Sequence, residues 1–309
     1  MYLPWLGEWK DVARTERPPL REYRAALTVG GVVYPSPPFV GVEGVRMFRD
    51  VGGAVGCEGM RKGLVFRSGD LSKLTDEGLR VVLGLGITTV FDLRSPIEMT
   101  QHLHGSAANG AANGNGVQRD IYPQHIAAAG IERVVVPVFP DDEWLQEKRD
   151  ARLMHYANAA EGYAEAYHHT LRSGAKAFAH ILRHLAQPDP SPILVHCTAG
   201  KDRTGVTAML ILLLVGSDDN AIADEYALND LDSGRSWGIK ATQRLLLQPG
   251  LRGNVEAVEN VIRARKSFML ATLKRFKAEY GCVEEYLEGV CGLDRGVVEA
   301  VRANVAVRS

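Results

Sequence analysis

Ten consecutive residues, from His196 to Gly205, carry the side chains with the clearest chemical use in this chain of 309 residues. They read HCTAGKDRTG, with Cys197 and Arg203 separated by five residues. A short apolar stretch precedes them, and an apolar run from Val206 to Val215 follows. A strand that turns through a glycine-containing loop into a helix directs backbone N–H groups and the positive end of the helix dipole toward one point. The pattern therefore predicts an anion-binding loop.

A cysteine at the start of such a loop is placed to act as a nucleophile, and not only to fill space in the core. The N–H groups and Arg203 stabilise the thiolate of Cys197, so it becomes nucleophilic near neutral pH. The planar guanidinium fork of Arg203 matches two phosphate oxygens. A lone cysteine after a strand is more often a small buried hydrophobe, but that role explains neither the loop glycine nor the Arg-Thr-Gly that opens the helix. The residues favour a cysteine-dependent phosphatase with a phosphocysteine intermediate, and no metal or cofactor is expected.

The neighbouring residues of the loop are expected to bind substrate and to order the site. Thr204 is placed to donate a hydrogen bond to the thiolate, and His196 to order the loop. Lys201 has two interpretations: a second cation that favours substrates with several phosphates, or the partner of an acid such as Asp92. The predicted substrate-binding set is Thr198, Ala199, Gly200, Lys201, Asp202 and Arg203.

This ten-residue segment resembles the signature of the atypical tyrosine and dual-specificity phosphatases of bacteria and fungi, the tyrosine phosphatase 3 family. Other blocks are similar to segments of the same family: FRDVGG at 48–53, FRSG at 66–69, DLRS at 92–95 and the tail around 280–287. The similarity covers about residues 38 to 305. It implies a phosphatase-type α/β domain, activity on phosphotyrosine and on phosphoserine or phosphothreonine, and a helical lid beyond residue 219.

The general acid that protonates the leaving oxygen has three candidate positions, and such proton donation is typically worth about 10²–10⁴-fold. The family resemblance implies Asp202, which lies inside the loop. Asp141 and Asp142 follow a strand, roughly where ordinary tyrosine phosphatases carry a mobile acid loop; a solvated turn is the alternative for this pair. Asp92 ends another predicted strand, and its alternative role is to orient Arg203 or Lys201.

Strands and helices are expected to alternate along the middle of the chain. The residue patterns predict strands at 64–67, 87–93 and 133–139, a helix capped by Thr75, a capping box at Ser95–Glu98 and a helix over 158–185. This alternation predicts an α/β fold, with a mainly parallel central sheet and helices on both faces. Asp92 and Arg94 then lie at the carboxyl end of a strand, where such sheets place their chemistry.

The expected organisation is an N-terminal arm over residues 1–40 and a single phosphatase domain over 41–309. The arm is rich in proline. A low-complexity run of Gly, Ala, Ser and Asn within 105–118 is expected to be a flexible surface insertion. The part from 219 to 309 is expected to be helical and to form the lid.

The overall composition bears on which kinds of partner and which cell compartment are expected, and it says little about the substrate. A formal net charge of −1 gives no overall attraction to nucleic acid or to a membrane surface. The apolar run 206–215 is about half of a membrane span, and the N-terminus lacks the pattern of a secretory signal. Four cysteines without metal-ligand spacing favour a reducing compartment, so a cytoplasmic location is expected. Basic residues within 263–277 form either the wet face of an amphipathic helix or a contact for anionic lipid.

Three functions remain open at this point. The first is hydrolysis of phosphorylated proteins; the second is hydrolysis of phosphoinositides by the same loop. The third is a module that binds phosphorylated partners without turnover. Expected partners are therefore a phosphorylated protein or a phosphoinositide, without nucleic acid and without integral membrane association.

Overall fold

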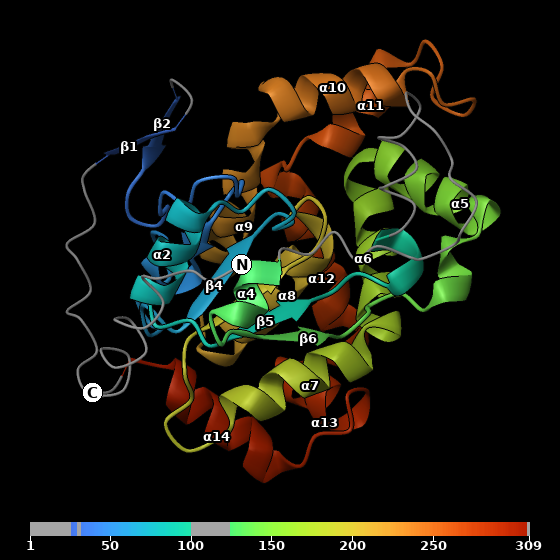
Figure 1. The fold of residues 1–309 in the computed structure, drawn as a ribbon. Helices are drawn as coiled ribbons and strands as arrows, with labels where there is room; N and C mark the ends of the chain where they lie inside the picture. The colour runs from blue at the N-terminus through green and yellow to red at the C-terminus, as the bar shows by residue number, and fades with distance from the viewer. Residues whose placement is uncertain (1–25, 30–31, 100–123, 308–309) are drawn as a thin grey trace.

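The computed structural model describes residues 26–29, 32–99 and 124–307, and its centre is a five-stranded sheet (Figure 1). The strands are β3 (Arg49–Asp50), β4 (Val65–Ser68), β5 (Thr89–Asp92), β6 (Glu132–Val135) and β7 (Ile193–His196). Their order is β3-β4-β7-β5-β6. All neighbours are parallel except β3, which pairs antiparallel with β4. The predicted α/β fold with a mainly parallel sheet is confirmed.

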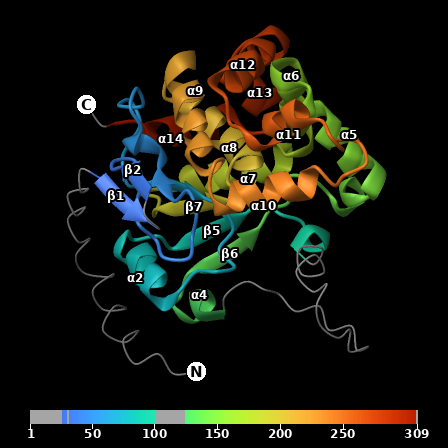
Figure 2. The ribbon, with the colours of Figure 1, turned by 90° about the horizontal axis from the view of Figure 1, so that it is seen from above.

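Helices cover both faces of this sheet, as Figures 1 and 2 show. On one face lie α2 (Asp76–Gly84) and α4 (Gln124–Ala128). Most of the others lie on the opposite face or at its margins: α5 (Gln146–Ala157), α6 (Ala159–Ser173), α7 (Ala175–Leu185), α8 (Asp202–Leu214), α9 (Asp219–Ala227), α10 (Ser236–Leu245), α11 (Val255–Ile262), α12 (Lys266–Tyr280), α13 (Val283–Gly289) and α14 (Arg295–Val305).

Alternating side chains of the central strands β4, β5 and β7 contribute to the two cores. In β7, Leu194 packs with α2 and α4, whereas Ile193 and Val195 belong to the larger core on the other face. Strand β4 divides in the same way between Phe66 and Val65. Because successive side chains of a strand point to opposite faces, a sheet covered on both sides needs apolar residues at every position. Helix α8 is buried almost throughout for the same reason, since it lies between the sheet and α6, α9 and α13.

Several predicted elements appear with shifted boundaries. Thr75 caps α2 by accepting a hydrogen bond from the N–H of Gly78 at 3.1 Å. The predicted helix over 158–185 is interrupted at Gly174, which separates α6 from α7. A Cβ at Gly174 would stand 2.7 Å from the ring of Phe178, so any larger residue would force that ring to move. The break lets α7 turn and pack against α14.

The expected N-terminal arm and the expected C-terminal lid both differ in part from what the structure shows. Within the expected arm, β1 (Ala26–Val29) and β2 (Val32–Pro35) form an antiparallel hairpin. The expected insertion at 105–118 lies outside the described residues. The helical character of the C-terminal part is confirmed, but α12 and α14 pack into the main core because each has an apolar face. Only α10 and α11 lie apart from that core, beside α5, so the lid stays a prediction for these two helices.

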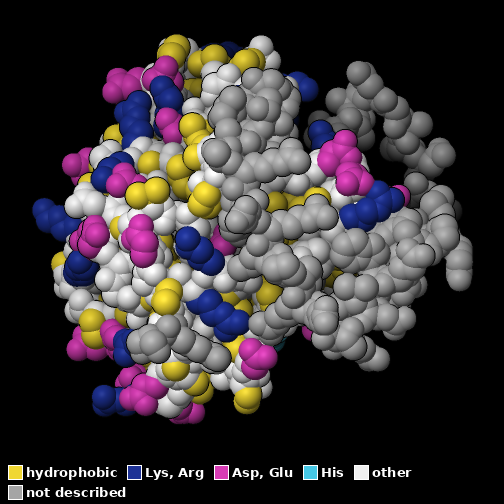
Figure 3. All heavy atoms as spheres, turned by 90° about the vertical axis from the view of Figure 1, so that its left-hand side faces the viewer, with side chains coloured by type: hydrophobic (Ala, Val, Ile, Leu, Met, Phe, Trp, Pro, Cys, Tyr) yellow, Lys and Arg dark blue, Asp and Glu magenta, His cyan; other side chains and the backbone are white. Residues whose placement is uncertain are grey.

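The charged surface carries both signs. On the face shown in Figure 3, Lys and Arg side chains are interspersed with Asp and Glu. The basic residues of α12 follow this rule: Lys266 pairs with Asp224, and Lys277 pairs with Asp219. The amphipathic interpretation of 263–277 therefore describes α12. Among the described residues, no helix combines the length and the apolar character that spanning a bilayer requires.

Candidate active site

The carboxyl ends of three neighbouring strands meet at one edge of the sheet. Ser68 of β4 and Asp92 of β5 both stand in register with His196 of β7. The chain leaves β7 at Cys197, which is almost completely buried, and enters α8 at Asp202. The predicted strand–loop–helix arrangement is therefore present.

The backbone of this loop forms a site for an anion. None of the amide N–H groups from Thr198 to Arg203 donates a hydrogen bond to another residue in the described part of the chain. Such groups at the start of a helix attract an anion because they are unpaired and aligned with the helix dipole. Gly200 has a φ of 71° and lies against β4, where a side chain would stand 2.4 Å from the carbonyl oxygen of Ser68. We refer to residues 197–203 as the phosphate loop.

Gly200 gives a prediction with a matched control. Gly216 has a similar φ of 75°, but a side chain there would meet no atom within 4 Å. Each change to alanine is expected to cost about 1–2 kcal/mol of stability for the left-handed backbone. Gly200→Ala should in addition weaken the binding of vanadate, because the phosphate loop must shift away from Ser68. Denaturant unfolding and vanadate inhibition measure the two effects; equal inhibition of the two variants would contradict this role of Gly200.

The carboxylate of Glu98, which was expected to complete a helix capping box, holds the guanidinium of Arg203 instead. The two terminal nitrogens of Arg203 donate to the carboxylate of Glu98 at 2.5 and 2.7 Å. Glu98 is buried and also accepts from the hydroxyl of Thr198 at 2.5 Å. The predicted capping box is half formed, since the N–H of Glu98 donates to Ser95 while its carboxylate turns to Arg203. This bidentate pair fixes the plane of the guanidinium before substrate arrives.

A buried ion cluster supports the phosphate loop from the other side. Arg67 donates to the carbonyl oxygen of Gly200 at 2.7 Å and to Glu225 at 2.5 Å. Glu225 also accepts from Arg49 at 2.7 Å. Burial alone would raise the pKa of Glu225, but the two guanidinium groups outweigh it and lower this pKa. Arg49 and Arg67 come from the FRDVGG and FRSG segments, so both segments help to support the phosphate loop.

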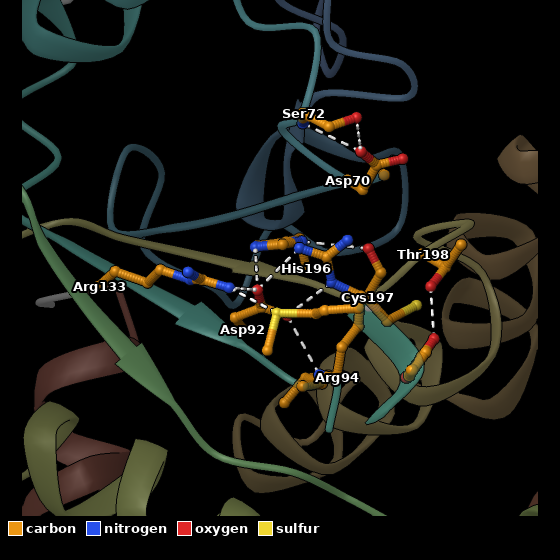
Figure 4. A network of polar contacts seen from close by, with 12 residues as sticks. Asp70, Ser72, Asp92, Arg94, Arg133, His196, Cys197 and Thr198 are labelled. Carbon is orange, nitrogen blue, oxygen red and sulfur yellow. Dashed lines mark hydrogen bonds and ion pairs between the residues drawn. The ribbon is translucent and has the colours of Figure 1, made fainter. Parts of the chain in front are cut away.

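Asp92 lies in a separate network, which Figure 4 shows around His196. Its carboxylate accepts from Arg94 at 2.8 and 2.9 Å and from Arg133 at 2.8 Å. The Nε2 atom of His196 lies 3.5 Å from it. Burial raises the pKa of Asp92, but His196 and the two arginines outweigh it and hold this pKa well below its usual range. The structure therefore places Asp92 away from the expected partners Arg203 and Lys201, and a carboxylate kept ionised is unsuited to donate a proton.

The same network leads to a pH-dependent stability prediction. Because the folded-state pKa of Asp92 is lowered, its stabilising contribution is fully present above its ordinary value of 3.8. The contribution is lost progressively as the pH falls from that value toward the lower folded-state pKa. Asp92→Asn should reduce the free energy of unfolding at pH 7 by about 3–5 kcal/mol, since the buried Arg94 and the half-buried Arg133 lose an ionised partner. The difference from the original protein should narrow at pH 3. Urea unfolding at both pH values tests this, with Asp142→Asn as a surface control; a difference independent of pH would contradict it.

His196 orders the loop by a contact of its own. Its Nδ1 lies 3.1 Å from the carbonyl oxygen of Cys197. Burial lowers the pKa of the imidazole despite the nearby carboxylate of Asp92, so the neutral form is favoured. This geometry is in line with the predicted structural role of His196.

Lys201 points to the C-terminal helices rather than to the anion site. Its ammonium donates to the carbonyl oxygens of Val261 and Arg263 at 2.7 and 3.1 Å and to the hydroxyl of Tyr163 at 2.8 Å. The closest acid is Asp202, whose Oδ1 is 3.6 Å away. This geometry is closer to the second interpretation, in which Lys201 is the partner of an acid, but the acid is Asp202 and not Asp92. Three neutral acceptors bind the ammonium as well.

The remaining candidates for the general acid lie in different surroundings. Asp202 is in the phosphate loop, and its Oδ1 accepts a hydrogen bond from Tyr167 at 2.8 Å. Asp141 and Asp142 are exposed in a short 3-10 helix, Asp141–Trp144, where Asp142 pairs with Lys148. That helix brings an aromatic ring to the site instead, since the Trp144 centroid lies 5.6 Å from the guanidinium carbon of Arg203. The solvated turn therefore describes Asp141 and Asp142.

Comparison with known proteins gives the family. The model of the tyrosine phosphatase family matches residues 40–307, a range that contains the whole phosphate loop. The chain belongs to the tyrosine phosphatase family. It is 27% identical over 277 residues to the triple specificity protein phosphatase PtpB of Mycobacterium tuberculosis, covering 84% of this chain and 96% of that protein. It is 29% identical over 167 residues to a tyrosine-protein phosphatase of Nostoc commune, covering 53% and 47%. The chain is therefore a phosphatase.

The site of this phosphatase also contains residues that its sequence did not point out. Glu98 was expected only as part of a capping box, and Tyr167 only as a residue of the predicted helix over 158–185. Both expectations are correct for the backbone or the ring, but the polar atoms contact residues 35 and 105 positions away. Within the described ranges, no cluster of His, Cys, Asp and Glu side chains is arranged to hold a metal ion.

Proposed function

We propose that this phosphatase hydrolyses phosphotyrosine in proteins through a phosphocysteine intermediate on Cys197. One observation carries the proposal: Cys197 precedes a run of amide N–H groups that donate to no residue within the described ranges, and Arg203 is fixed beside them by Glu98. These groups match the three equatorial oxygens of a phosphoryl group in transfer. A module that only binds phosphate would not need the cysteine.

The reaction has two displacement steps. In the first, the thiolate of Cys197 attacks phosphorus, the bond from phosphorus to the tyrosine oxygen breaks, and Asp202 gives its proton to the leaving oxygen. In the second, water attacks the phosphocysteine, Asp202 takes a proton from that water, and the thiolate leaves. The hydroxyl of Thr204 is buried and has no hydrogen-bond partner in the described part of the chain. It is therefore available to stabilise the thiolate in both steps.

The surroundings favour a substrate with an aromatic ring. The Phe139 and Trp144 rings lie 5.9 and 5.6 Å from the guanidinium carbon of Arg203, at a distance suited to flank an aryl phosphate. A phosphoinositide activity would need a second cation that is available to the substrate. Lys201 was the candidate, but its ammonium donates to the hydroxyl of Tyr163 and to the carbonyl oxygen of Val261. Activity on phosphoserine and phosphothreonine is part of the proposal, supported by the name of the mycobacterial relative.

Two further parts of the proposal concern organisation and location. A single phosphatase domain over 41–309 is supported by the extent of the family match. A cytoplasmic location is supported by the four cysteines, all of which are free.

A substrate panel tests this function. Purified protein is given a phosphotyrosine peptide, the same peptide with phosphoserine, and a phosphoinositide in mixed micelles, and phosphate release is measured. The phosphotyrosine peptide should have the highest kcat/KM, and vanadate should inhibit all activity. A higher kcat/KM for the phosphoinositide would overturn the choice of substrate.

A further inference from the structure

A buried chain of hydroxyl groups ends on the candidate general acid. Tyr167 of α6 and Tyr226 of α9 are almost completely buried, and their hydroxyl oxygens lie 2.8 Å apart. The hydroxyl of Tyr167 also lies 2.8 Å from Oδ1 of Asp202. The order Tyr226–Tyr167–Asp202 connects the helical layer with the first residue of α8.

Which hydroxyl donates in each of these hydrogen bonds follows from the single proton that each phenol carries. Burial raises the pKa of both phenols well above the ordinary value, so both keep their protons. A phenol has one proton to donate. Because Tyr167 donates its proton to Asp202, Tyr226 must be the donor in the contact between the two tyrosines. Each hydroxyl is thereby fixed in orientation.

The two oxygens of the Asp202 carboxylate have different surroundings, and only Oδ1 contacts Tyr167 and Lys201. Oδ1 receives the hydrogen bond from Tyr167 and lies 3.6 Å from the ammonium of Lys201. Oδ2 has no hydrogen-bond partner among the residues that the structure describes. A proton on Oδ1 would compete with the Tyr167 hydrogen and face the Lys201 charge, whereas a proton on Oδ2 meets neither.

We propose that Tyr167, oriented by Tyr226, is a positioning residue that reserves Oδ1 of Asp202 as an acceptor and so places the transferable proton on Oδ2. This inference rests on the proposed role of Asp202. In the first step the proton leaves Oδ2 for the tyrosine oxygen, and the carboxylate formed is stabilised on Oδ1 by Tyr167 and Lys201. In the second step Oδ2 accepts a proton from the attacking water. Tyr167 keeps its own proton throughout.

The test uses leaving groups of graded acidity. The kcat/KM values for aryl phosphates, from 2,4-dinitrophenyl phosphate to phenyl phosphate, report how much proton donation assists the first step. A poor leaving group depends on the acid, and a very acidic phenol does not. Tyr167→Phe should lower kcat/KM about tenfold for phenyl phosphate and less than twofold for the dinitrophenyl ester. Tyr226→Phe should give a smaller change in the same direction.

A matched control separates positioning from structural damage. Tyr286 is also buried, and its hydroxyl donates to the carbonyl oxygen of Leu171 at 2.7 Å, away from the phosphate loop. Tyr286→Phe should leave the dependence on the leaving group unchanged. An equal loss for all esters in Tyr167→Phe would show only a structural role and overturn the inference.

The variant Asp202→Asn shows whether a negative result for Tyr167→Phe overturns only the role of Tyr167 or also the proposed role of Asp202. If Asp202→Asn shows a steep dependence on the leaving group and Tyr167→Phe does not, Asp202 is the acid and the inference about Tyr167 is wrong. If Asp202→Asn itself shows no steeper dependence, the proposed role of Asp202 is wrong. Should Tyr167→Phe fail to fold, Tyr226→Phe gives the same comparison.

Discussion

Cys197→Ser is expected to lower kcat for phosphotyrosine peptides by a factor on the order of 10⁴ or more, since removing a nucleophile removes the reaction path itself. The serine hydroxyl is not ionised in the phosphate loop and cannot accept the phosphoryl group at a comparable rate. The amide N–H groups and Arg203 remain, so the variant should still bind the phosphopeptide. Phosphate release measures the first effect, and fluorescence anisotropy of a labelled peptide measures the second.

The control for this variant is another cysteine with the same chemical change. Cys282 is exposed and lies at the start of α13, outside the phosphate loop. Cys282→Ser should retain the activity of the original protein. If Cys197→Ser retained a substantial part of the activity, another group would have to be the nucleophile.

Arg203→Lys is expected to have the second-largest effect, a loss of about 10²–10³ in kcat/KM. Lysine keeps the positive charge, but its ammonium cannot pair with both oxygens of Glu98 and present a planar fork to phosphate. The loss should be smaller for the binding of product phosphate than for kcat/KM, because the fork matters most when charge spreads over the equatorial oxygens. Steady-state kinetics with phosphate as a competitive inhibitor measures both quantities.

An arginine far from the phosphate loop provides the comparison. Arg302 of α14 is partly buried, pairs with Glu284 and donates to the carbonyl oxygen of Leu214 at 2.9 Å. Arg302→Lys should leave kcat/KM unchanged. Similar kinetics for Arg203→Lys and the original protein would show that charge alone, without the fork, is sufficient.

The fold could be predicted where one segment determines its own conformation. The alternation of apolar and turn residues placed the parallel strands, and Thr75 marked the start of α2 because a cap is a local contact. The break at Gly174 could not be predicted, since the direction of α7 depends on its packing against α14, which comes at the far end of the chain. The packing of α12 and α14 into the core likewise depends on which apolar faces meet across the chain.

The same limit applies to the site. The phosphate loop is contiguous in sequence, and its conformation follows from its own residues. The partners of its side chains are distant: Glu98 lies 105 positions before Arg203, and Val261 lies 60 positions after Lys201. The place of Asp92 at the end of a neighbouring strand suggested it as a partner for Arg203 or Lys201. Arg94, Arg133 and His196 surround its carboxylate instead. The sequence pointed to candidate reacting groups, but the side chains that hold them come from distant parts of the chain.

Rapid-quench mass spectrometry tests the central claim most directly. The protein is mixed with a phosphotyrosine peptide, quenched within milliseconds and digested, and the phosphorylated peptide is sequenced. We predict one phosphoryl group on the sulfur of Cys197, formed and lost at rates compatible with turnover. A phosphoryl group on another residue, or turnover without any phosphorylated protein under conditions that preserve a synthetic phosphocysteine, would contradict it.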